Sequence, residues 1–183
     1  MGPCTIVEAG GERLLFEAGR ACSIRLAQAH VPWSGLTNVF LTHLHADHTF
    51  ALPDLFLVGW ILGRADPLQV RGPNGTKEML VSMIHVLDVD ITSRLGSGMQ
   101  ARQPPKYIAT EIERGLVFEH GGMKVTAFEV DHSVSPTFGY RIDFNGRSVV
   151  ISGDTRYSEG LIRNAQGVDV LIHEVVFGSP YEF

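Results

Sequence analysis

The stretch NVFLTHLHADHTF, residues 38–50, decides both the fold and the chemistry that we expect of this chain. Its first part is apolar and typical of a buried strand, and it ends in the pattern H-x-H-x-D-H at residues 43–48. Three of the chain's eight histidines lie within these six positions. Imidazole nitrogens and a carboxylate gathered in this way are typical ligands of zinc and similar metals. We therefore predict a metal site directly after the strand.

The spacing within this stretch predicts how the ligands are divided. Side chains two positions apart in an extended chain point the same way, so His43 and His45 are expected to face one point. Asp47 and His48 are adjacent and cannot both serve that face, so the chain must turn at Ala46-Asp47 if both bind. Such a turn favours a second metal beside the first. A helix that follows would point its partly positive end at the site and favour an anionic ligand.

Two further candidate ligands follow later strand-like runs. His132 ends the run in FEVDHSVSP, and Asp154 follows a buried run and a glycine in VVISGDT, where a carboxylate can bridge two cations. Asp131, beside His132, either supports that ligand or is simply solvated. The remaining histidines in helical, turn or helix-end positions are expected to be structural or exposed; they are His30, His85 and His120.

Strand and helix patterns are mixed along the whole chain, with hairpin turns predicted at Gly10-Gly11 and Asn145-Gly146. In the first half we expect strands at 4–9, 13–18, 38–42 and 67–73, and helices at 23–30 (capped by Ser23), from Asp47 or Thr49 to Leu62 (with Pro53 in its first turn) and at 74–89. In the second half we expect strands at 115–120, 124–130, 137–144, 147–153 and 168–177, and a helix at 159–167. This mixture predicts an α/β fold with mixed sheets.

Residues 92–110 interrupt the pattern with two glycines, two prolines and no apolar period, so a long loop is expected there. The loop either meets an anionic substrate or is a solvated connection. Its candidate contacts are Arg94, Arg102, Lys106 and Tyr107.

Length and composition predict one globular domain over residues 1–183, with 44% hydrophobic and 19% charged residues. The formal charge of −5 gives no general attraction to nucleic acid or to an anionic membrane. It does not decide whether the surface has a local basic patch. Cys4 and Cys22 show no metal-ligand spacing, so we predict two reduced, buried residues in a cytoplasmic protein. The most apolar window is shorter than a membrane span and predicts a buried helix, so no membrane partner is expected.

Four motifs together resemble a known family. THLHADH, DHSVSPTFGYR, SGDT and LIHE occur in the order seen in metallo-β-lactamase-fold hydrolases, most like the ribonuclease Z and arylsulfatase-like branch. GPCTIVEAGGERLLFEAGR is similar to the early hairpin of that family. The resemblance implies an αββα sandwich of mixed sheets flanked by helices. It also implies two zinc ions: one held by His43, His45 and His132, the other by Asp47 and His48, with Asp154 bridging them.

The resemblance extends to catalytic residues and shows departures. Glu174 in LIHE resembles an acid that orients a later catalytic histidine. Apart from the resemblance, Asp47 is expected either to accept a proton from the attacking water or to hold its orientation. His173 then looks like a buried strand residue, and Glu17 stands where the family commonly has aspartate. The chain lacks the glycine-rich first strand and ends before the family's histidine proton donor and the final ligand of the second metal. We therefore expect a fold that is incomplete at both ends, from a fragment of a longer protein.

The function that we expect is a zinc-dependent hydrolase, with Mn²⁺ as the alternative metal, in which a metal-bound hydroxide attacks a phosphodiester. The expected substrate is an anionic ester, RNA included. Residues 133–153 leave no room for the protruding arm of transfer-RNA-processing members. This absence is an argument against a transfer-RNA substrate. The alternatives are hydrolysis of an aryl sulfate, hydrolysis of a lactam or lactone, and a catalytically incomplete metal-binding module. Family likeness also implies a homodimer.

Overall fold

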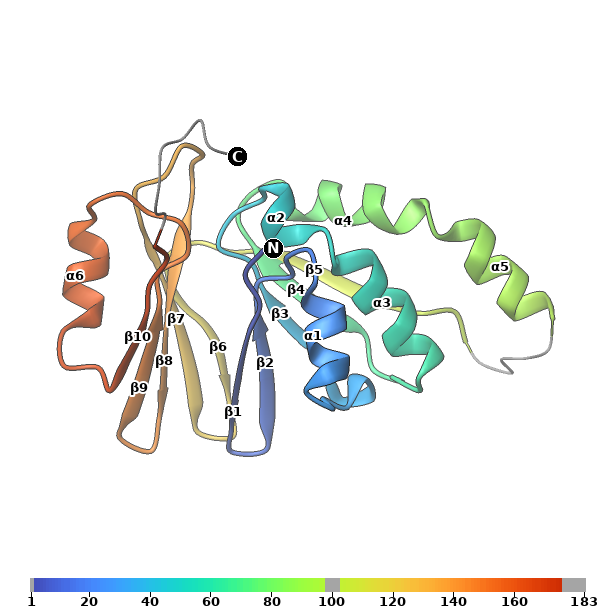
Figure 1. Cartoon of the computed structure of the whole chain (residues 1–183), viewed down its shortest axis with the longest axis horizontal. Helices are drawn as coiled ribbons and strands as arrows, with labels where there is room; N and C mark the ends of the chain where they lie inside the picture. The colour runs from blue at the N-terminus through green and yellow to red at the C-terminus, as the bar shows by residue number, and fades with distance from the viewer. Residues whose placement is uncertain (1, 98–102, 176–183) are drawn as a thin grey trace. The chain divides into compact units, whose positions relative to one another are not determined.

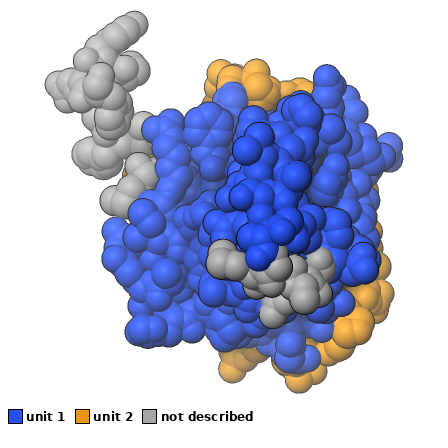
Figure 2. All heavy atoms as spheres, turned by 90° about the vertical axis from the view of Figure 1, so that its right-hand side faces the viewer, with its two compact units in different colours: residues 1–113 blue, residues 114–183 orange. Residues whose placement is uncertain are grey.

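The structure, a computed structural model, describes residues 2–97 and 103–175. The chain divides into two compact units, which Figure 2 colours separately: unit 1 comprises residues 1–113 and unit 2 residues 114–183. Each unit has its own five-stranded sheet.

The sheet of unit 1 has the strand order β1-β2-β3-β4-β5. Its first two strands, β1 (Thr5–Ala9) and β2 (Glu12–Phe16), form the predicted hairpin, in which Gly10 and Gly11 have positive φ angles of 58° and 81°. The strands β3 (Asn38–Phe40), β4 (Leu68–Gly72) and β5 (Tyr107–Glu111) then follow in parallel with β2. Parallel neighbours need crossovers, which helices supply.

The helices of unit 1 are α1 (Cys22–Gln28), α2 (Ala46–Thr49), α3 (Leu52–Ile61), α4 (Thr76–His85) and α5 (Asp88–Gly96), together with the short 3₁₀ helix η1 (Trp33–Gly35). Within this unit, α1, α3 and α4 lie to one side of the sheet (Figure 1). Val39 and Val70 from the strands join Leu52, Leu55 and Phe56 of α3 in one buried core. The apolar window around α3 is therefore a buried helix, as predicted.

The sheet of unit 2 has the order β10-β9-β8-β7-β6. Its strands are β6 (Gly115–His120), β7 (Met123–Glu129), β8 (Phe138–Phe144), β9 (Arg147–Ile151) and β10 (Val170–Ile172), and its helix is α6 (Glu159–Ala165). The pairs from β6 to β9 are antiparallel, whereas β10 runs parallel to β9. Phe128, Val150 and Leu161 join α6 to this sheet in a small core. The predicted Asn145-Gly146 turn is present, with both φ angles positive.

Both sheets contain parallel and antiparallel pairs and are accompanied by helices, so the expected α/β class with mixed sheets is confirmed. Among residues 2–97 and 103–175, no helix is both long and apolar enough to cross a lipid bilayer.

The predicted long loop at 92–110 is wrong at both ends. Its first residues continue helix α5, where Arg94 pairs with Asp90 one turn earlier at 2.9 Å, and its last residues form β5. Tyr107 packs edge-on against Phe56. Arg102 lies outside the described residues. Local charge pairing and the neighbouring strand β4 outweigh the turn-forming composition of this segment.

Helix boundaries also differ from those predicted. The segment from Asp47 to Leu62 is divided into α2 and α3, with Pro53 in the first turn of α3, and the helix predicted to end at residue 89 ends at His85. The cap position of α1 is Ala21, so Ser23 is not its cap.

The strand β10 was predicted to be buried, but Val170, Leu171 and Ile172 are 38–48% exposed. The reason is its position at the edge of the sheet, where the described residues supply no further strand beyond it. An apolar run of this kind has the same composition in an edge strand and in a central one.

The prediction of two reduced cysteines is wrong. Cys4 and Cys22 form a disulfide, with their Cα atoms 5.4 Å apart. The start of β1 and the start of α1 meet because the N–H of Gly19 donates to the carbonyl of Pro3 at 2.9 Å. A spacing of 18 residues says nothing about such a contact until the tertiary structure is known.

Candidate metal centre

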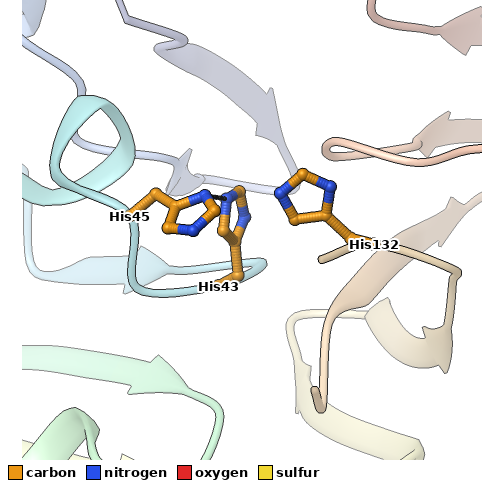
Figure 3. A group of neighbouring side chains, drawn as sticks. All are labelled: His43, His45 and His132. Carbon is orange, nitrogen blue, oxygen red and sulfur yellow. Dashed lines mark hydrogen bonds between the residues drawn. The ribbon is translucent and has the colours of Figure 1, made fainter. Parts of the chain in front are cut away.

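His43 and His45 lie in the segment that follows strand β3 in unit 1. The N–H of Leu41 still donates to the carbonyl of Arg71 in β4, after which the chain leaves the sheet. The Nε2 atom of His43 and the Nδ1 atom of His45 are 2.9 Å apart. Figure 3 marks this contact with a dashed line. The structure thus brings together the nitrogen atoms of the two side chains that the i, i+2 spacing predicted to converge.

A hydroxyl group determines which nitrogen of His43 is offered to a metal. Thr42 Oγ1 lies 2.9 Å from His43 Nδ1, and both residues are completely buried. A metal-ligating histidine usually has its second ring nitrogen hydrogen-bonded in this way, which sets its tautomer and ring orientation. The candidate ligand atom of His43 is therefore Nε2. Thr42 was not predicted as a site residue, although a hydroxyl residue directly before a candidate ligand is a signal that could have indicated it.

His48 is oriented by the carboxylate of Glu17, the residue that follows strand β2. Helix α2 begins directly after His45, so the chain turns at Ala46, where the spacing required a turn. Within it, His48 Nδ1 lies 2.8 Å from Glu17 Oε2, and both side chains are almost fully buried. The centroid of the His48 ring is 4.0 Å from that of His43. The candidate ligand atom of His48 is therefore Nε2, on the ring edge away from Glu17.

Asp47 offers the carboxylate of this segment. Its side chain is about half exposed, and its Oδ2 atom lies 3.8 Å from His48 Nε2. A carboxylate at this distance is positioned to share a cation with the imidazole or to hold a water molecule beside it. Unit 1 thus gathers His43, His45, Asp47 and His48 into one cluster.

His132 and Asp154 come together in unit 2. His132 follows strand β7, and Asp154 follows strand β9. His132 Nε2 lies 4.0 Å from Asp154 Oδ2, and both side chains are about one-fifth to one-quarter exposed. Ser133 Oγ is 3.4 Å from the same nitrogen of His132. Unit 2 therefore offers an imidazole and a carboxylate side by side at the ends of two strands.

Glu174 lies just beyond strand β10, and its Oε1 atom accepts the backbone N–H of Thr155. Glu174 therefore holds the backbone at Thr155, the residue that follows Asp154. His173 is exposed, so its prediction as a buried residue is wrong. The cause is again the edge position of β10.

Asp131 is more than half exposed, and its carboxylate lies 4.0 Å from Arg156 Nη1. Its backbone carbonyl accepts the N–H of Arg156 at 2.7 Å. Of the two alternatives for Asp131, the structure favours a solvated carboxylate.

Among the described residues, the other histidines predicted to be structural or exposed belong to neither group of possible metal ligands. His85 is a strongly exposed residue at the end of α4 and pairs with Asp88 at 2.6 Å. His30 follows α1 with a φ of 54°, and His120 ends strand β6.

A histidine-rich turn after a buried parallel strand, with its rings held by a buried carboxylate and a hydroxyl, is the site of a metal-binding α/β protein. The chain belongs to the metallo-beta-lactamase superfamily, which its residues 1–181 match.

Curated relatives share this sequence over nearly all of its length. The chain is 36% identical over 178 residues to Ribonuclease Z from Mycobacterium sp. (strain KMS), covering 96% of this chain and 62% of that protein. It is 37% identical over 179 residues to Ribonuclease Z from Mycobacterium marinum (strain ATCC BAA-535 / M), covering 96% and 64%. The chain thus spans somewhat less than two thirds of the length of these relatives.

Solved structures show the same fold. Human tRNase Z, short form, matches 97% of this chain and 72% of its own with a TM-score of 0.75 and 22% identity. The metallo-beta-lactamase fold protein YhfI from Bacillus subtilis matches 93% and 63%, with a TM-score of 0.67 and 21% identity. These likenesses confirm the fold that the four motifs implied.

Proposed function

We propose that this chain carries the metal-binding part of a divalent-metal-dependent phosphodiesterase of the ribonuclease Z type. The metal requirement rests on one observation, the 2.9 Å between His43 Nε2 and His45 Nδ1. Two imidazole nitrogens this close, with the ring of His43 held by Thr42, are arranged to share one cation. The choice of a phosphodiester is supported by the relatives named Ribonuclease Z, which match 96% of this chain.

The proposed ligands are those that the family resemblance implied. One metal takes His43, His45 and His132, the other takes Asp47 and His48, and Asp154 is shared between them. Contacts within each unit support this assignment. In unit 1, His43 Nε2 is 2.9 Å from His45 Nδ1 and the His43 and His48 ring centroids are 4.0 Å apart, and in unit 2 His132 Nε2 is 4.0 Å from Asp154 Oδ2. Imidazole with carboxylate is a donor set that zinc accepts well, so we propose two zinc ions, with Mn²⁺ as the alternative.

When bound, the metals would supply Lewis acidity, lowering the pKa of water and neutralising charge on the phosphate oxygens. The protein's own groups have separate tasks. Thr42 and Glu17 hold the rings of His43 and His48 in place through their Nδ1 atoms. The half-exposed carboxylate of Asp47 is placed to accept a proton from the attacking water or to orient it. Glu174, by accepting the N–H of Thr155, keeps the backbone beside Asp154 in position.

The proposed substrate is RNA or another anionic phosphodiester, on the strength of the named relatives. Because the net charge is −5, recognition of RNA has to come from local groups and from the bound cations. The homodimer and the cytoplasmic location stay predictions. Hydrolysis of an aryl sulfate, hydrolysis of a lactam, and metal binding without catalysis are the alternatives that the activity panel distinguishes.

The metal site is tested first on the 183-residue chain. We expect the metal-free protein to take up zinc with a dissociation constant at or below the micromolar range, measured by competition with a chromophoric chelator. His43→Ala should remove most of this binding, because the ring is completely buried at the centre of the cluster. His85→Ala is the matched control, since this histidine is strongly exposed at the end of α4. Equal zinc binding by both variants and the wild type would contradict the proposed site.

Catalysis is tested on the product of the complete reading frame loaded with zinc or manganese. The panel contains bis(4-nitrophenyl) phosphate, a precursor transfer RNA, 4-nitrophenyl sulfate and a β-lactam. We expect metal-dependent turnover of a phosphodiester. Turnover of the sulfate or the lactam alone would replace this function by one of the alternatives, and metal binding without any turnover would favour the binding module.

A further inference from the structure

The segment from the end of strand β2 to the first residue of helix α1, residues 17–22, has a sterically costly backbone. Glu17 has a φ of 68° and Ala21 a φ of 131°, and neither residue is glycine. A side chain in this region of φ clashes with its own backbone, so such residues persist only where surrounding contacts hold them. This segment also carries the carboxylate that orients His48.

Three backbone hydrogen bonds hold the segment on strand β3, on the metal-binding turn and on the first residues of the chain. The N–H of Glu17 donates to Phe40, that of Ala18 to His48 and that of Gly19 to Pro3, with lengths of 2.8–2.9 Å. The disulfide between Cys4 and Cys22 adds a covalent link between this segment and the first residues of the chain. Residues 17–22 are therefore held from both sides.

Gly2 and Gly19, which lie near the two ends of the disulfide, pack closely against the backbone of Asp47. A Cβ atom added to Gly2 would lie 1.8 Å from the carbonyl oxygen of Asp47, and one added to Gly19 would lie 2.4 Å from it. Both glycine backbones therefore pack against the peptide of this candidate ligand without room for a side chain. Cys22 Sγ is also 4.0 Å from the carbonyl oxygen of Glu17. Cys4 is thus two positions from Gly2, and Cys22 is three positions from Gly19 and contacts the backbone of Glu17.

We propose that the Cys4–Cys22 disulfide is a redox-sensitive positioning element of the metal-binding turn. Closed, it holds residues 2–4 and 17–22 against Asp47 and keeps Glu17 on His48. Opened, it lets the strained segment relax, so the turn binds divalent metal less tightly. This inference rests on the proposed function in one respect, because it takes the histidines and the aspartate of residues 43–48 as metal ligands.

The reductant that opens the bond is a dithiol. It transfers two electrons and two protons, so that the S–S bond between Cys4 and Cys22 is replaced by two S–H groups while the dithiol becomes a cyclic disulfide. Reoxidation reverses this step and restores the closed form.

The test compares zinc affinity before and after reduction of the 183-residue chain. A phosphine reductant is used, because it does not add a second thiol chelator; with water it becomes a phosphine oxide as the two cysteine thiols form. Thiol titration of the denatured protein should find no thiol before reduction and two after it. After the phosphine is removed, we expect the zinc dissociation constant to rise about tenfold, the lower end of the effect of losing a group that orients ligands. Reoxidation should restore the original value.

The Cys4→Ser, Cys22→Ser double variant controls for zinc binding by the released thiols. It should show the weakened affinity of the reduced protein and should not respond to the phosphine. Two thiols in the untreated protein, or equal zinc affinity of the oxidised and reduced forms, would overturn the proposal while leaving the metal site intact. Absence of zinc binding by the oxidised wild type would instead overturn the proposed function.

Discussion

Glu17 and His48 form a buried pair in unit 1, with Oε2 of the carboxylate 2.8 Å from Nδ1 of the imidazole. The other carboxylate oxygen, Oε1, accepts the N–H of Thr42 at 2.7 Å. One side chain therefore holds both ends of the turn that contains the candidate ligands. The backbone of Glu17 adopts the left-handed conformation, with a φ of 68°.

Replacing Glu17 by glutamine should weaken metal binding. The variant keeps the shape of the side chain but loses the charge that stabilises the metal-ligating tautomer of His48, so we expect zinc affinity to fall about tenfold. Competition with a chromophoric chelator measures the change. Glu78→Gln, at an exposed position of helix α4, is the control and should bind zinc as the wild type does. Unchanged affinity in Glu17→Gln would show that the pair does not act on the metal.

Asp154 and Asp131 should respond differently to substitution by alanine. Asp154 lies beside His132, so Asp154→Ala is expected to lower the metal content and to abolish phosphodiester turnover. Asp131 is more than half exposed and pairs loosely with Arg156, so Asp131→Ala should retain the metal. Elemental analysis of the purified variants measures the metal content. Full metal content and full rate in Asp154→Ala would exclude it as the shared ligand.

Gly59 in helix α3 should not tolerate a methyl group. A Cβ atom there would lie 2.0 Å from Nη1 of Arg64, whose guanidinium donates to the carbonyls of Leu55 and Phe56 at 3.0 and 2.8 Å. Burial lowers the pKa of Arg64 to about 10, so moving this cation leaves a desolvated charge without its partners. We expect Gly59→Ala to reduce the free energy of unfolding by about 1–3 kcal/mol.

Urea denaturation measures this loss, and Gly96→Ala is its matched control. Gly96 ends helix α5, and a Cβ atom there meets nothing within 4 Å. Alanine favours the helix more than glycine does, so the control should be unchanged or more stable by up to about 1 kcal/mol. Equal destabilisation by both substitutions would show that the Arg64 contact is not the cause.

Asp169 should make the stability of the protein depend on pH in the acid range. The hydrogen bond from Arg147, together with the N–H of Ser148, holds the pKa of its carboxyl below the usual value. A carboxyl with a lowered pKa in the folded state contributes stability above its unfolded pKa of about 3.9. That contribution is lost as the pH falls through the lower folded value.

Asp169→Asn should remove this part of the pH dependence. Urea midpoints between pH 2 and pH 7 compare the variant with the wild type, and Asp66→Asn, at an exposed position of unit 1, controls for the loss of one negative charge. We expect the two stability curves of Asp169→Asn and the wild type to converge at the acid end. Parallel curves over the whole range would contradict the role of the Arg147 pair.

Features that depend on neighbouring residues were predictable from the sequence. The cluster at residues 43–48 was recognised because its ligands lie within six positions of one chain segment, where strand spacing and a turn determine their directions. The hairpins at Gly10-Gly11 and Asn145-Gly146 were predicted because two-residue turns with positive φ favour glycine and asparagine. The buried helix α3 followed from an apolar run of sufficient length.

Features that join distant residues were decided by the tertiary structure. The Glu17–His48 pair spans 31 positions and exists because β2 and β3 are parallel neighbours, so that their carboxyl ends meet at one edge of the sheet. The Cys4–Cys22 bond depends on the contact between Pro3 and Gly19, and the exposure of β10 on its place at a sheet edge. Residue type and spacing along the chain therefore determined which groups can bind a metal. Strand order in the folded chain decided which groups hold them in place, because only it brings distant backbone segments into contact.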